Sequence, residues 1–225
     1  MIAWQSPLVI SGVQGVDVVS RLEQQMRFVE EAGLLKRVLR QTMLTDPRRR
    51  ENSAEHSWHL AVMALVLAEY APQGTDVSRV LGMVLIHDLV EIDAGDLFAY
   101  AGADAQTRQD EAERAAADRI FALLPAEQAA QARGLWDEFE QRMTPEARFA
   151  RALDRLQPML ANMRAGGGTW QRHGITADQV LEKVALVDDG SPELGAFARE
   201  LVSRAVRTGL LAPAPAAGAG PADRA

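Results

Sequence analysis

The segment His87–Asp96 reads HDLVEIDAGD and places charged side chains directly after an apolar stretch, VSRVLGMVLI at 77–86. These ten residues hold one histidine and four carboxylates. Burying an unpaired charge costs several kcal/mol, so a core helix with this content needs compensating partners. We predict a helix that runs from 77 to about Gly95, in which His87 and Glu91 share one face because they are four residues apart. The pattern therefore indicates a chemical site at the end of a buried helix.

The composition of the whole chain is typical of a helical protein with a packed core. The 225 residues are 48% hydrophobic and only 5% aromatic, which favours helices over sheet. The net charge of −7 argues against binding to nucleic acid polymers or anionic membranes. A small phosphorylated ligand remains compatible with this charge, because a local cation can reverse the field at one site. Cysteine is absent, which excludes disulfides and cysteine-ligated zinc.

The apolar segments are too short for membrane insertion. The longest uninterrupted apolar run covers 60–68, well below the length that spans a bilayer. No basic start followed by a long apolar run is seen at the N-terminus. We therefore expect a cytoplasmic protein without membrane contact.

Apolar residues recur at spacings of three and four over most of the chain, which predicts an all-α, single-domain helical bundle. We expect the domain to cover 1–211 and an Ala/Pro/Gly-rich disordered tail to cover 212–225. No segment shows a convincing strand period, and a short helix is predicted around Leu34–Leu39. Ser53 is the predicted N-cap of the most apolar helix. The other helices are predicted at 18–29, 77–95, 104–124, 126–142, 145–165, 176–188 and 192–210.

Two further residues complete a candidate metal site. Imidazole and carboxylate groups together suit a divalent ion of intermediate softness, but His87 and its neighbours cannot fill a coordination shell alone. His56 precedes the apolar helix core, and Asp154 borders an apolar stripe in mid-helix, which is unfavourable without a partner. His59 is expected to be an ordinary hydrogen-bonded helix histidine. Taken alone, His87 and Asp88 favour a plain helix-terminal pair of a histidine and a carboxylate, and only together with His56 and Asp154 do they favour a metal site.

The segments ENSAEH, HDLVEIDAGD and LDRLQP, in this order, resemble the HD-domain phosphohydrolases, and most closely the branch that includes 5′-deoxynucleotidases. The resemblance implies a helical bundle and a homodimer that binds one or two divalent ions. The metal ligands implied by it are His56, His87, Asp88 and Asp154. The identity of the ion stays open among Mn, Co, Mg, Fe, Zn and Ni.

The resemblance also implies roles around the metal. The ion would polarise a phosphoryl oxygen and activate water, Glu91 would orient or deprotonate that water, and Asp96 would protonate the leaving group or bind a sugar hydroxyl. An arginine upstream of His56 would hold the phosphate, with Arg40 as first choice and Arg49 as second. Arg48 and Arg50 flank Arg49 and are weaker candidates.

The expected function is metal-dependent removal of phosphate from a small phosphomonoester, namely a (deoxy)nucleoside 5′-monophosphate. Two alternatives remain open. The first is a phosphodiesterase or guanosine polyphosphate hydrolase that uses the same site. The second is a nucleotide-binding regulator without catalysis.

Overall fold

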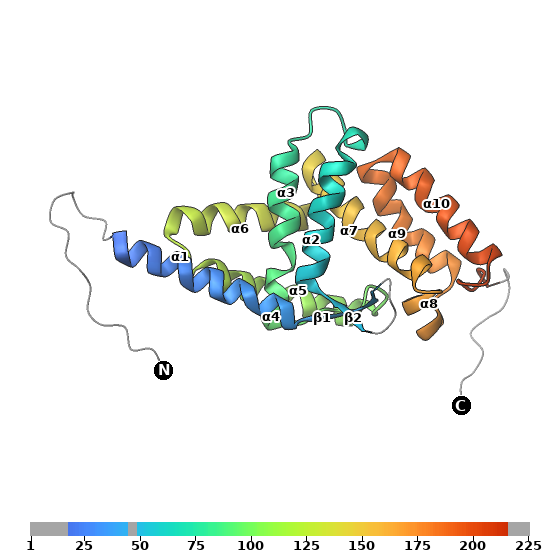
Figure 1. Ribbon diagram of the computed structural model, residues 1–225, viewed down its shortest axis with the longest axis horizontal. Coiled ribbons are helices and arrows are strands. Elements are labelled where there is room, and N and C mark those ends of the chain that lie inside the picture. The colour runs from blue at the N-terminus through green and yellow to red at the C-terminus, as the bar shows by residue number, and fades with distance from the viewer. Residues whose placement is uncertain (1–17, 45–48, 216–225) are drawn as a thin grey trace.

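The computed structural model describes residues 18–44 and 49–215, and nearly all of its regular structure is helical (Figure 1). The α-helices are α1 Val18–Ala32, α2 Ser53–Val66, α3 Val77–Ile86, α4 Glu91–Ala94, α5 Ala103–Phe121, α6 Ala126–Gln141, α7 Pro145–Arg164, α8 Gly168–Arg172, α9 Ala177–Gly190 and α10 Pro192–Arg207. Short 3-10 helices occur at η1 Gly33–Arg37, η2 Ala68–Tyr70 and η3 His87–Val90, and two strands at β1 Leu39–Met43 and β2 Arg50–Asn52. The predicted helical bundle is therefore confirmed.

The helices pack around two hydrophobic cores. In Figure 1, α2 and α3 stand side by side near the centre, with α1, α5 and α6 toward one end and α7, α9 and α10 toward the other. The larger core joins α2, α3, α7, α9 and α10 through residues such as Leu60, Val80 and Leu153. The smaller core joins η3, α5 and α6 through residues that include Ile120 and Trp136. Segment 87–94 leads from the larger core into the smaller one.

Most helix ends follow local capping signals that the sequence displays. The Asp76 carboxylate accepts hydrogen bonds from the first turn of α3, and Thr144 caps α7 ahead of Pro145. The N-cap of α2 is Asn52 and not the predicted Ser53. Asn52 forms a capping box with Glu55. The Ser53 hydroxyl instead donates a hydrogen bond to the carboxylate of Glu91.

The predicted helix 77–95 is interrupted where its charged residues begin. α3 ends at Ile86, η3 covers His87–Val90, and α4 is a single turn that ends before Gly95. Gly95 has φ +75°, a backbone conformation that only glycine adopts readily. The expectation that His87 and Glu91 lie on one face of a continuous α-helix was therefore wrong, although both side chains reach the same site.

The short helix predicted around Leu34–Leu39 is present as the 3-10 helix η1, and a short antiparallel hairpin that the sequence did not predict follows it. β1 pairs with β2 so that Leu39 lies opposite Asn52 and Met43 opposite Arg50. The Ser53 N–H donates to the Val38 carbonyl at 3.1 Å, which ties the hairpin to the start of α2. Because this pairing joins segments about ten residues apart, no periodicity within either segment announces it.

The last described residues pack against the bundle. Leu211 is buried, and the Ala212 carbonyl accepts a hydrogen bond from the N–H of Ala177 at 2.9 Å. The predicted disordered tail begins at 212, but residues 216–225 lie outside the described part of the chain. Within the described residues, no helix combines the length and apolar character needed to cross a membrane.

Candidate metal centre and the cavity around it

Three buried side chains from distant parts of the chain converge at one point. His56 comes from α2, His87 from the start of η3, and Asp154 from the middle of α7. One potential ligand atom from each lies within 4.8 Å of the others. Two imidazoles and a carboxylate are a donor set typical of catalytic divalent metal sites.

His56 is completely buried and is held on both ring nitrogens. Its Nδ1 lies 3.1 Å from Oε1 of Gln157, and its Nε2 lies 3.0 Å from Oδ1 of Asp154. Burial and the positive charge of Arg40 lower the pKa of His56 to about 4. A neutral imidazole is the form that binds a metal, and its hydrogen bond through Nδ1 orients the ring as outer partners of metal ligands do.

His87 presents a nitrogen that has no hydrogen bond. Its Nδ1 lies 3.1 Å from the Val84 carbonyl, which can only accept, so Nδ1 carries the proton in the neutral ring. Its buried Nε2 makes no hydrogen bond, although Oδ1 of Asp88 lies 3.0 Å away and Oδ1 of Asp154 lies 3.8 Å away. Burial opposes charge on this ring, but the two carboxylates outweigh it and raise its pKa to about 10. An unpaired nitrogen facing two carboxylates fits a bound cation.

Asp88, the fourth predicted ligand, lies beside this trio. Its Oδ2 accepts a hydrogen bond from Nη1 of Arg40 at 3.0 Å. Burial favours the neutral acid, but His87 and Arg40 hold the pKa of Asp88 below its ordinary value. The carboxylate is thus negatively charged and shared between the imidazole and the guanidinium.

The predicted catalytic carboxylates Glu91 and Asp96 face the same cavity. Oε2 of Glu91 accepts a hydrogen bond from the Ser53 hydroxyl at 2.6 Å. Burial and the nearby Asp88 and Asp96 raise the pKa of Glu91 well above its ordinary value. Burial also raises the pKa of Asp96, and raised carboxyl pKa values in a cavity are typical of groups that transfer protons.

The predicted phosphate-binding arginines are placed very differently. Arg40 lies on β1 with its guanidinium in the cavity, where it contacts Asp88 and lies 3.8 Å from Asp96. Arg49 is exposed, forms a two-pronged ion pair with Glu55 at 2.6 and 2.9 Å, and does not line the cavity. Arg50 donates to backbone carbonyls of β1, and Arg48 lies outside the described residues.

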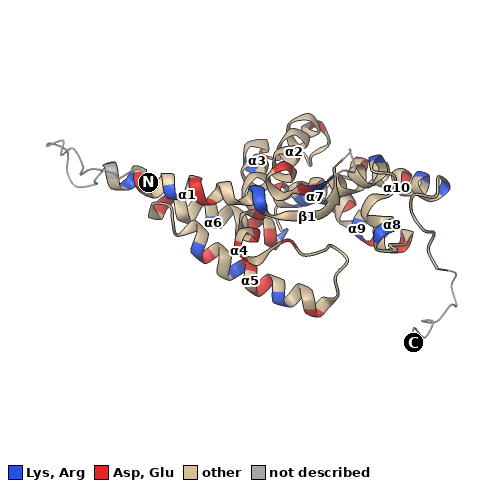
Figure 2. Ribbon diagram, turned by 60° about the horizontal axis from the view of Figure 1, so that its bottom comes forward, with Lys and Arg blue, Asp and Glu red and all other residues tan. Residues whose placement is uncertain are grey.

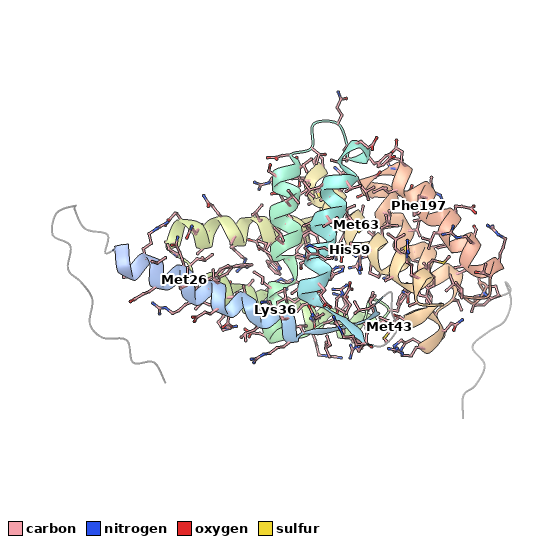
Figure 3. The ribbon with its side chains drawn as sticks, in the orientation of Figure 1. Met26, Lys36, Met43, His59, Met63 and Phe197 are labelled. Atoms are coloured by element: carbon pink, nitrogen blue, oxygen red, sulfur yellow. The ribbon has the colours of Figure 1, made fainter. Side chains whose placement is uncertain are left out.

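Several residues that support the site were not found from the sequence. Glu51, on β2, is buried and accepts a hydrogen bond from Nε2 of Gln157 at 2.8 Å, so it fixes the amide that orients His56. Burial raises the pKa of Glu51 to about 7. Gln157 also lies 3.2 Å from Nδ1 of His59, the helix histidine labelled in Figure 3. Gln157 follows Asp154 by three positions, a spacing that could have revealed it, whereas Glu51 carries no such signal.

The cavity in front of these residues has a volume of about 600 Å³, within the range of small-molecule sites. It is lined on one side by β1, η3 and the turn after α4, and on the other by α6, α7 and α9. The His87 ring packs against Phe139 with ring centroids 4.8 Å apart. The cluster therefore opens into a space that can hold a nucleotide-sized molecule.

Comparisons with known proteins agree with this arrangement. The HD domain family model matches residues 32–194. A solved structure from Magnetospirillum magnetotacticum MS-1, described as a predicted metal-dependent phosphohydrolase, is 55% identical, with a TM-score of 0.84 over 88% of this chain and 99% of that one.

More distant curated relatives are the 5′-deoxynucleotidases HDDC2. The Xenopus laevis protein is 29% identical over 60% of this chain and 66% of its own length, and the human protein is 30% identical over 60% and 65%. The match thus spans slightly less than two thirds of these relatives. On the family match, which covers the hairpin and every helix from α2 to α9, the chain belongs to the HD-domain family.

Proposed function

We propose that this protein is a metal-dependent phosphohydrolase that removes phosphate from a small phosphomonoester, with (deoxy)nucleoside 5′-monophosphates as the substrate class. The observation that carries the proposal is the buried group of His56, His87 and Asp154 beside a polar cavity. The likeness to the HDDC2 5′-deoxynucleotidases supports the substrate class. The homodimer and the cytoplasmic location expected from the sequence stay predictions.

His56, His87 and Asp154 would hold the divalent ion, with Asp88 as the fourth candidate ligand. A bound ion would supply Lewis-acid activation of the phosphoryl group and of water. The Nε2 of His87 suits this role because it has no hydrogen bond within the protein. Oδ1 of Asp154 lies 3.8 Å from it and 3.0 Å from Nε2 of His56, so one ion could reach all three groups.

The other residues would move protons and orient the substrate. Glu91 takes a proton from water as the water oxygen attacks phosphorus; burial and the nearby Asp88 raise its pKa, which makes it a stronger base than an ordinary carboxylate. As the phosphorus–oxygen ester bond breaks, Asp96 gives a proton to the leaving alkoxide; burial raises its pKa, the direction that favours a proton donor. Arg40 contributes a guanidinium toward the phosphate oxygens.

The test combines metal analysis with a substrate panel. Purified protein is analysed for bound transition metals and then assayed for phosphate release from nucleoside 5′-monophosphates, a cyclic nucleotide and a bridging diester. We expect turnover of the monophosphates that chelator abolishes and added metal restores. Preference for a diester by tenfold or more would favour the phosphodiesterase alternative, and absence of turnover with metal bound would favour the regulator.

A further inference from the structure

Helix α7 carries two arginines on its cavity-facing side. Arg151 and Arg155 are four residues apart, so they share one face of the helix, and both line the cavity. Lys183 of α9 lines the same side. Blue segments along α7 mark basic positions in Figure 2. Because like charges at this spacing destabilise a helix, the arrangement calls for a compensating anion.

The protein provides little negative charge for these three cations. Arg151 and Arg155 both approach Oδ2 of Asp154, at 3.3 and 3.6 Å, while Oδ1 of Asp154 faces the two histidines. Among the described residues, Lys183 has no carboxylate at ion-pair distance and lies over the Tyr100 ring at 5.8 Å. Asp154, the carboxylate that the two arginines share, is also a candidate metal ligand. Its negative charge would then be balanced by the metal ion rather than by the arginines.

One other carboxylate, that of Glu140, lies nearby but forms no ion pair with Arg151, Arg155 or Lys183. Glu140 lines the cavity and attracts Arg155. The ion pair that Glu140 makes is with Arg142, at 3.9 Å. Glu140 therefore leaves Arg155 without a second direct partner.

Buried hydrogen-bond donors without a partner also favour a bound anion beside α7. The Nε atoms of Arg151 and Arg155 are buried and have no hydrogen-bond partner. The side chains nevertheless keep 12% and 24% of their surface exposed to the cavity, so a ligand can reach the guanidinium groups. Arginine presents a planar fork of donors that matches a phosphate group.

Arg40, on β1, has more carboxylates at short range than the α7 arginines, although its buried Nε likewise has no hydrogen-bond partner. Its guanidinium lies 3.0 Å from Asp88, 3.7 Å from Glu51 and 3.8 Å from Asp96. In the proposed function, a metal ion and Arg40 would supply cations for the phosphate that is hydrolysed. The uncompensated positive charge lies elsewhere, on α7 and α9.

We infer that Arg151, Arg155 and Lys183 form a second anion-binding subsite, which holds a phosphate of the substrate other than the one removed. The inference rests on the proposed phosphohydrolase activity and extends its substrate class from nucleoside 5′-monophosphates to small molecules with a second, separate phosphate group, such as nucleoside bisphosphates. A cavity of about 600 Å³ has room for such a molecule.

The test measures binding without turnover. Glu91→Gln protein loaded with metal is titrated by calorimetry with a nucleoside 5′-monophosphate and with the corresponding nucleoside 3′,5′-bisphosphate. We expect the bisphosphate to bind about tenfold or more tightly, since an added charge-assisted contact is worth at least that factor. Adding Arg155→Met or Lys183→Met should remove this gain and leave the monophosphate affinity unchanged.

Controls separate the subsite from general effects of charge and folding. Arg164→Met removes an exposed arginine from the same helix, outside the cavity, and should leave both affinities unchanged. Metal content and thermal melting are measured for each variant. Should Arg155→Met lose metal because Asp154 is its neighbour, Lys183→Met on the separate helix α9 decides the matter.

The inference is overturned if the two nucleotides bind equally, or if Arg155→Met and Lys183→Met leave the bisphosphate affinity unchanged. Equal weakening of both nucleotides also overturns it, because the cations would then hold the hydrolysed phosphate. Parallel assays of wild-type protein test the proposed function separately. Tight bisphosphate binding without phosphate release from either nucleotide would remove the hydrolase proposal and keep the subsite.

Discussion

The two walls of the cavity carry opposite imbalances of charge. The carboxylate wall consists of Asp88, Glu91 and Asp96, with Arg40 as its cation. The arginine wall consists of Arg151, Arg155 and Lys183. Arg151 and Arg155 share the carboxylate of Asp154. Neither wall is neutral by itself.

The contrast shows what each wall is suited to bind. Crowded carboxylates raise one another's pKa, as for Glu91, and are stabilised by a cation. Crowded guanidinium groups are stabilised by an anion. Asp154 stands between the walls, with one oxygen toward the histidines and one toward the arginines. A metal ion would balance the charge of the carboxylate wall, and a phosphorylated molecule would balance that of the arginine wall.

The largest expected effect is loss of the metal. His56→Ala, His87→Ala and Asp154→Ala should each strip the ion and reduce phosphate release to background, because three protein ligands cannot lose one and keep the site. Metal content and turnover are measured together. Asp88→Ala sharpens the comparison: loss of metal makes Asp88 a ligand, whereas retention confines it to the carboxylate wall. Stoichiometric metal in Asp154→Ala would contradict the assignment of the centre.

The next effect concerns Glu91. Glu91→Gln keeps the shape and the hydrogen bond from Ser53 but cannot accept a proton, so kcat should fall by roughly 10²- to 10⁴-fold while metal content stays constant. Steady-state kinetics and metal analysis check this. Near-normal turnover would mean that Glu91 contributes only charge to its wall.

Arg40 and Arg49 form a matched pair for a smaller effect. Arg40→Lys should raise KM by about 10-fold or more, because lysine cannot reproduce a forked contact, with little change in metal content. Arg49→Lys should leave KM and kcat unchanged, since Arg49 is exposed and paired with Glu55. An Arg40→Lys enzyme with normal kinetics would show that Arg40 only neutralises its carboxylates.

The smallest effect is on stability. Burial, with repulsion from Glu140 and Asp88, raises the pKa of Glu113 on α5 from 4.5 to about 7. A raised carboxyl pKa means that the folded state binds more protons than the unfolded state between these values, so stability falls as pH rises from about 4.5 to 7.

Glu113→Gln should remove that loss and stabilise the protein by roughly 1 kcal/mol at pH 8, after discounting for solvent screening. Its advantage over wild type should shrink near pH 4. Chemical denaturation at both pH values measures the difference in the free energy of unfolding between variant and wild type. The exposed Glu111→Gln is the control. An equal gain at both pH values would contradict an origin in the charge of Glu113.

Local signals in the sequence were sufficient for most of the helices, although not for the break after Ile86. Helix ends at Asp76 and Thr144 follow from capping chemistry that acts within one turn. The candidates His56, His87 and Asp154 followed from the resemblance to HD-domain proteins, and the HD-domain match bears out that resemblance. The i, i+4 pair Arg151 and Arg155 was also visible in the sequence but had no meaning without its surroundings.

Only the tertiary structure decided which side chains face the cavity. The hairpin turns Arg40 inward and leaves Arg49 on the surface, although both were candidates from the sequence, with Arg40 as the first choice. The same hairpin buries Glu51 against Gln157. The gathering of Arg155 and Lys183 depends on α7 and α9 packing together. These placements depend on contacts between residues far apart in the chain, where pairing and burial outweigh local preference, so no periodicity or capping signal encodes them.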